Sequence, residues 1–151
     1  MTVRVLGTLH SGFTVADVRR TAGFFRDCLG FAVTDPRTAP TAALSQIVGI
    51  EGAVAEIIFV SAPGHTIELL QYRSPGSATT TAPRPCDIGF AHLSLLVDDV
   101  RTAAQAAAAY GFMATPAMPL LSTGPFAGRH VTYLRDAHGF TLEIMSESAA
   151  H

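Results

Sequence analysis

The chain has 151 residues, of which 48% are apolar and 15% are charged. This length suits one domain, or two small modules that share a core, since single domains most often have about 100 to 150 residues. A charge content this low excludes an intrinsically disordered chain. The formal net charge of −2, without any long basic run, also argues against a nucleic-acid partner.

The sequence also argues against a membrane protein. No stretch approaches the roughly 20 apolar residues that span a bilayer. The amino terminus has no extended apolar segment with a cleavage site, so we expect no signal peptide. Cys28 and Cys86 form no CxxC pair and are too few for a disulfide framework. We therefore predict a cytoplasmic protein that has no membrane partner.

The elements in chain order predict a strand, a helix and three strands, twice over. In the first half, a strand at 9–15 precedes a helix that Asp17 caps and Gly30 ends, and strands follow at 31–34, 55–60 and 66–72. In the second half, a strand at 91–97 precedes a helix that Asp99 opens and Gly111 ends, and strands follow at 112–115, 130–134 and 140–145. This order predicts an α+β fold with mixed sheets.

The two halves repeat each other in sequence. The segment His10–Asp17 matches His92–Asp99 at an offset of 82 (92 − 10), and Glu68 matches Glu143 at an offset of 75 (143 − 68). Between the copies lies a stretch rich in Ser, Thr, Pro and Gly, which suits a mobile connection. We therefore predict a first module at 1–72, a linker at 73–88 and a second module at 89–151.

The alternation along the strands predicts where chemistry takes place. Side chains of a strand alternate between its two faces. This alternation places one face of each half entirely apolar, as expected under helices, and places four ionisable residues on the other face: His10, Glu68, His92 and Glu143. Such groups are costly to bury unless something pairs them. A divalent cation satisfies two imidazoles and two carboxylates, and this donor set suits Ni, Co, Mn, Fe or Zn.

Two other interpretations of these four residues remain open. The histidines can be hydrogen-bonded core residues, and the glutamates can pair with Arg73, Arg129 or Arg135. Repetition favours the metal site, because each ligand type recurs at the equivalent place in both halves and packing does not require that.

Five segments together resemble the vicinal oxygen chelate superfamily, which includes glyoxalase I, methylmalonyl-CoA epimerase, extradiol dioxygenases, fosfomycin-resistance enzymes and bleomycin-binding proteins. They are residues 10–17, 24–31, 66–70, 90–99 and 135–143. The resemblance implies two βαβββ modules whose sheets curl around a shared metal-binding cleft. It also implies that His10, Glu68, His92 and Glu143 are the metal ligands, and by analogy we expect a homodimer.

The resemblance implies a function as well. The two His and two Glu look most like glyoxalase I, and other features resemble methylmalonyl-CoA epimerase. We therefore expect a divalent-metal-dependent lyase or isomerase that transfers a proton next to the carbonyl of a small carbonyl or thioester substrate, with Glu143 or Glu68 as general base and acid. The alternatives are a protein that sequesters a hydrophobic ligand or antibiotic, and an Fe(II) dioxygenase. Glu51 lies near the position of a second base in the epimerases, but a solvated loop carboxylate is its default interpretation.

Overall fold

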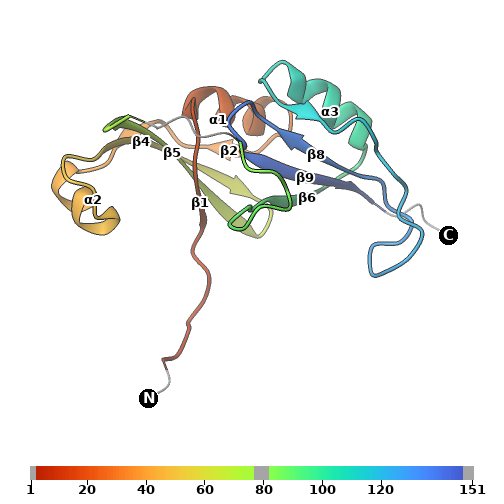
Figure 1. The fold of residues 1–151 in the computed structure, drawn as a ribbon, viewed down its shortest axis with the longest axis horizontal. Helices are drawn as coiled ribbons and strands as arrows, with labels where there is room; N and C mark the ends of the chain where they lie inside the picture. Colours follow the sequence, from red (N-terminus) through yellow and green to blue (C-terminus); the bar gives the residue numbers. More distant parts are fainter. Residues whose placement is uncertain (1–2, 77–81, 148–151) are drawn as a thin grey trace. The chain divides into compact units, whose positions relative to one another are not determined.

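The computed structural model describes residues 3–76 and 82–147. The chain divides into two compact units, Met1–Ser77 and Ala78–His151 (Figure 1). No helix within the described residues is long and apolar enough to cross a membrane.

The first unit is a mixed sheet with two helices. Its elements are β1 (Ser11–Thr14), α1 (Val18–Asp27), β2 (Ala32–Val33), β3 (Arg37–Thr38), α2 (Thr41–Val48), β4 (Val54–Ala62) and β5 (His65–Ser74). The strand order is β1-β5-β4-β2, and β3 also pairs with β4. Strand β1 runs parallel to β5, whereas the other pairs are antiparallel. The long hairpin of β4 and β5 therefore forms the centre of this unit.

Helix α1 covers one face of this sheet. The side chain of Asp17 accepts a hydrogen bond from the backbone N–H of Arg20 at 2.9 Å, which confirms the predicted cap. The helix buries Val18, Phe24 and Phe25 completely and packs against β4 and β5. From the sheet, Ile67 and Leu69 of β5 are also fully buried. The opposite face of β5, which includes Glu68, is left outside this core.

The second unit repeats the plan with one helix. Its elements are β6 (Leu93–Val97), α3 (Val100–Ala108), β7 (Met113–Ala114), β8 (Val131–Arg135) and β9 (Thr141–Ser146), in the sheet order β6-β9-β8-β7. Strand β6 runs parallel to β9, as β1 does to β5. Asp99 caps α3 through the N–H of Thr102. Leu142 and Ile144 of β9 are fully buried, and Glu143 lies between them on the other face.

The predicted α+β architecture is confirmed, with two additions in the first unit. Helix α2 and strand β3 were not predicted from the sequence. Helix α2 begins after Pro40, which provides no side-chain cap, and only Leu44 of the helix is buried. Both residues of β3 are exposed. Helix α2 ends at Gly49 in the left-handed conformation but has no N-cap side chain, and β3 has no buried residue. The start signal of a helix and the apolar alternation of a strand, on which sequence prediction depends, are therefore missing.

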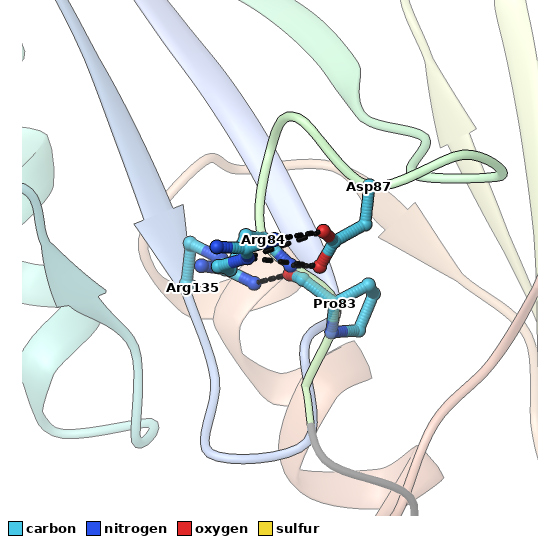
Figure 2. A network of polar contacts seen from close by, with 4 residues as sticks. All are labelled: Pro83, Arg84, Asp87 and Arg135. Carbon is cyan, nitrogen blue, oxygen red and sulfur yellow. Dashed lines mark hydrogen bonds and ion pairs between the residues drawn. The ribbon is translucent and has the colours of Figure 1, made fainter.

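Part of the predicted linker is tied to the second unit. Strand β5 continues to Ser74, and residues 77–81 lie outside the described residues. Ala82 and Pro83 lie beside Gly139, in the turn between β8 and β9. Figure 2 shows Arg135 donating a hydrogen bond to the carbonyl of Pro83, and Arg84 paired with Asp87. Hydrogen bonds from Arg84 hold the pKa of Asp87 below its usual range. The module boundaries at 1–72, 73–88 and 89–151 stay a prediction.

Candidate functional site

In the first unit, three residues form a row across neighbouring strands. Gly12 of β1 is paired with Glu68 of β5, and Glu68 is paired with Phe59 of β4. Residues in register on adjacent strands project from the same face of a sheet. Because Ile67 and Leu69 are buried on the other face, Glu68 projects from the face that lies opposite the core.

His10 lies beside this row. It directly precedes β1, and its Nε2 is 3.3 Å from Oε2 of Glu68. The His10 side chain is 39% exposed and that of Glu68 is 18% exposed. The imidazole also meets the Phe59 ring edge-on, with 6.0 Å between the ring centroids. His10 is therefore an accessible side chain that pairs with the glutamate, not a core histidine.

The second unit has an equivalent row. Ser94 of β6 is paired with Glu143 of β9, and Glu143 is paired with Tyr133 of β8. His92 directly precedes β6, and its Nε2 is 3.8 Å from Oε2 of Glu143. The Ser94 hydroxyl donates a hydrogen bond to the other carboxylate oxygen, Oε1, at 2.7 Å. Each unit thus brings one predicted imidazole and one predicted carboxylate together.

Aromatic rings surround His92 within its unit. The centroid of its ring is 5.1 Å from that of Tyr133 and 5.9 Å from that of Phe90, and these two rings are 6.1 Å apart. The guanidinium of Arg135 lies 5.6 Å from the Phe90 centroid, a cation–π distance. The same guanidinium also donates a hydrogen bond to the carbonyl oxygen of Pro83 (Figure 2). The segment from Pro83 to Phe90 therefore helps to fix the orientation of His92.

A pocket of about 360 Å³ opens beside Glu143. Glu143 and Tyr133 line it together, and its other walls are formed by Thr115, Ala117, Pro119, Val131 and Thr132. Partial burial, together with the negative charge of Glu143, raises the pKa of Tyr133. The phenol therefore keeps its proton at neutral pH and is a hydrogen-bond donor.

The arginines considered from the sequence have other partners. Arg73 forms an ion pair with Glu56, Arg129 donates to the carbonyl of Ser146, and Arg135 donates to Pro83. None of them pairs with Glu68 or Glu143 in the described part of the chain. Glu51 is exposed in the turn between α2 and β4, as expected of a solvated loop carboxylate.

Within residues 3–76 and 82–147, no three His, Cys, Asp or Glu side chains are grouped closely enough to hold a metal ion. The structure thus brings His10 to Glu68 and His92 to Glu143, each pair inside its own unit. Sequence reasoning missed the roles of Ser94 and Tyr133. The repeat contains a signal for the first, since Ser94 occupies the place of Gly12 at the same offset of 82 (94 − 12).

Comparisons with known proteins agree with this architecture. Residues 7–144 match the model of the Glyoxalase/Bleomycin resistance protein/Dioxygenase superfamily. A glyoxalase family protein from Bacillus cereus is 16% identical with a TM-score of 0.79, and the match covers 97% of each chain. A glyoxylase/bleomycin resistance protein/dioxygenase domain from Frankia sp. EAN1pec is 20% identical with a TM-score of 0.64, over 98% of this chain and 96% of that chain.

The fosfomycin resistance protein FosX from Listeria monocytogenes, solved with Mn(II) and sulfate, is 12% identical with a TM-score of 0.58. That match covers 95% of this chain and 94% of the FosX chain. No curated protein matches the sequence. The family match spans nearly the whole chain, including both imidazole–carboxylate pairs. The chain therefore belongs to the Glyoxalase/Bleomycin resistance protein/Dioxygenase superfamily.

Proposed function

We propose that this protein is a divalent-metal-dependent lyase or isomerase that transfers a proton next to the carbonyl of a small substrate. The observation that carries the proposal is the recurrence of an imidazole–carboxylate pair at equivalent positions of both units, with 3.3 Å between His10 and Glu68 and 3.8 Å between His92 and Glu143. Both units keep this pair, although the position beside each glutamate has diverged, with Gly12 in the first unit and Ser94 in the second.

The donor set fits a first-row cation. Nitrogen and oxygen ligands bind such an ion at about 2.0 to 2.2 Å, so two donors of one ion are at most roughly 4.4 Å apart. Both measured separations fall within this limit. We propose that His10, Glu68, His92 and Glu143 together hold one ion, since two neutral imidazoles and two carboxylates balance its charge and suit Ni, Co, Mn, Zn or Fe.

The residues of the chain have distinct tasks in this proposal. A bound cation supplies polarisation of the substrate's carbonyl oxygen. Either Glu143 or Glu68 accepts the proton from the neighbouring carbon and returns it, as general base and acid. Ser94 holds one oxygen of Glu143 and leaves the other oxygen facing His92. The exposed edges of both histidines keep the site open to a small substrate.

Metal analysis of the full chain, prepared without chelators, tests this proposal directly. We expect close to one ion per chain and loss of that ion in either His10→Asn or His92→Asn. His138→Asn, in an exposed turn, is the matched control and keeps the ion. Two ions per chain, each lost separately, contradict the shared ligand set. If the protein holds no metal and catalyses no uptake of solvent deuterium into 2-oxo or thioester substrates, the proposal that it is a metal-dependent lyase or isomerase is wrong.

A second candidate is a protein that sequesters a hydrophobic or antibiotic molecule. The pocket beside Glu143 favours it, because Ala117, Pro119 and Val131 provide apolar walls. This candidate predicts tight binding without turnover, and binding that survives Glu143→Gln. Loss of both binding and exchange in that variant supports the enzyme instead. For either function we expect a homodimer, which light scattering on the full chain checks.

A further inference from the structure

The two imidazole–carboxylate pairs have different polar surroundings although the halves repeat each other. The row across the first unit is Gly12, Glu68 and Phe59, and the row across the second is Ser94, Glu143 and Tyr133. Position by position, the first row has no hydroxyl and the second has two. A duplication begins with two identical halves, so the two rows have diverged since. The hydroxyls of the second row suit it to bind a polar group of a ligand.

The two hydroxyls of the second row are engaged differently. Ser94 already donates to Glu143. Among the other hydroxyls around the pocket, Thr115 and Thr132 are hydrogen-bonded to each other at 2.7 Å. The Tyr133 hydroxyl makes no hydrogen bond with any residue of the described ranges, although the ring is fixed against His92 and Phe90. Tyr133 is therefore a donor held in place without an acceptor among the residues that the structure describes.

The pocket determines what this donor can meet. Tyr133 and Glu143 lie on its wall together with the small apolar side chains of Ala117, Pro119 and Val131. A volume of about 360 Å³ is at the lower end of small-molecule sites. This lining suits a small molecule with an oxygen acceptor at one end and a short aliphatic group at the other. Phe59, in the matching place of the first unit, has no donor to offer.

We propose that Tyr133 is a substrate-binding residue whose hydroxyl donates a hydrogen bond to an oxygen of a small carbonyl compound, while the compound's short branched aliphatic group packs against Ala117, Pro119 and Val131. This inference rests on the proposed function, because it takes the bound oxygen to be the one next to the carbon that exchanges its proton. It adds to that function a class of substrate and a residue of the second unit that binds the substrate's oxygen.

Binding of 3-methyl-2-oxobutanoate, a 2-oxo acid with a branched aliphatic group, tests the assignment. Calorimetry on the full chain, with and without Mn(II), gives the dissociation constant for wild type and Tyr133→Phe. We expect the variant to bind the probe about tenfold more weakly, the usual effect of one lost hydrogen bond. The chain has three tyrosines and no tryptophan, so a change in tyrosine fluorescence on binding that Tyr133→Phe abolishes reports the same contact. Tyr110→Phe, in the turn that follows α3, is the matched control and binds like wild type.

A second variant tests the pocket without touching the hydroxyl. Ala117 is exposed, so Ala117→Leu is compatible with the fold. It narrows the pocket and should weaken binding of 3-methyl-2-oxobutanoate by several-fold while leaving pyruvate binding nearly unchanged. Equal losses for both probes overturn the proposed position of the aliphatic group.

The outcomes separate this inference from the proposed function. Metal content should be the same in Tyr133→Phe and wild type. If metal binds and both proteins bind the probe equally, the role of Tyr133 is wrong while the metal enzyme stands. If no metal binds but the affinity for the probe still falls in Tyr133→Phe, the proposed metal enzyme is wrong while the role of Tyr133 stands. If wild type binds neither probe, the substrate class is wrong.

Discussion

The hydroxyl of Ser94 donates a hydrogen bond to Oε1 of Glu143 across 2.7 Å, which joins β6 to the carboxylate of its neighbour β9. At the matching position of the first unit, Gly12 offers no such donor to Glu68. Hydrogen bonds to ligand residues fix the orientation in which those residues meet a metal. The carboxylate of Glu143 is therefore restrained, and that of Glu68 is free of this restraint.

Ser94→Ala should weaken divalent-metal binding by about tenfold or more, because loss of a hydrogen bond to a ligand typically costs 10–100-fold in affinity. Ser94→Thr keeps a hydroxyl on the same strand and should bind metal nearly as wild type does. Calorimetric titration with Co(II) measures both variants. Equal affinities for wild type and Ser94→Ala would show that Glu143 needs no support from β6.

Gly139→Ala should destabilise the second unit through two separate effects. Gly139 has a φ of +95°, and a Cβ there would lie 2.8 Å from Cδ of Pro83. Gly124, with a φ of +84°, has nothing within 4 Å of a Cβ, so Gly124→Ala isolates the cost of the backbone conformation, about 1 kcal/mol. We expect urea unfolding to show a clearly larger loss for Gly139→Ala. Similar losses of unfolding free energy in Gly139→Ala and Gly124→Ala would mean that Pro83 shifts away from the added Cβ at little cost.

Much of the fold was predictable because its main elements have strong local signals. Asp17 and Asp99 cap helices in the way the sequence indicated. The alternation in β5 and β9 placed Ile67 and Ile144 in the cores. Helix α2 is not predicted, because it has no N-cap side chain and buries only Leu44, although Gly49 ends it in the left-handed conformation. Its position depends on packing against the core residues Ala53 and Ala55, which no local pattern in the sequence indicates.

The candidate site was predictable only in part, for a geometric reason. Alternation predicts the face on which a residue lies, and it placed Glu68 and Glu143 on the open faces. It does not give the register between strands that are far apart in sequence. Tyr133 lies directly across from Glu143, and this relation exists only once β8 and β9 are paired. The shared ligand set of both units stays a prediction.

Glu56→Gln should lower the stability of the first unit at neutral pH by about 1 kcal/mol, because both arginine partners are more than half exposed and solvent screens such ion pairs. Glu56 is 13% exposed and meets Arg19 and Arg73 at 2.6 Å each. The Arg73 hydrogen bond first, and then the charge of Arg19, hold the pKa of Glu56 below its ordinary value of 4.5.

Because this pKa is lowered in the folded protein, the stabilisation is present above pH 4.5 and is lost as the pH falls below that value towards the pKa of the folded state. Urea unfolding of wild type and Glu56→Gln should therefore converge in acid. Glu51→Gln, which changes an exposed turn carboxylate, is the control and should follow wild type throughout. A constant difference between Glu56→Gln and wild type at all pH values would exclude the ionised carboxylate as the cause.

Gly12→Ala should weaken metal binding by a few-fold while leaving the fold intact. A Cβ at Gly12 would lie 3.3 Å from Oε2 of Glu68, the oxygen that faces His10. This contact is tight, so the carboxylate must shift by a few tenths of an ångström, and a ligand shifted in this way meets a cation less well. Gly7→Ala is the matched control, because nothing lies within 4 Å of a Cβ there. Co(II) titration of both variants should show a loss for Gly12→Ala alone, and unchanged binding in Gly12→Ala would mean that Oε2 is not a ligand atom.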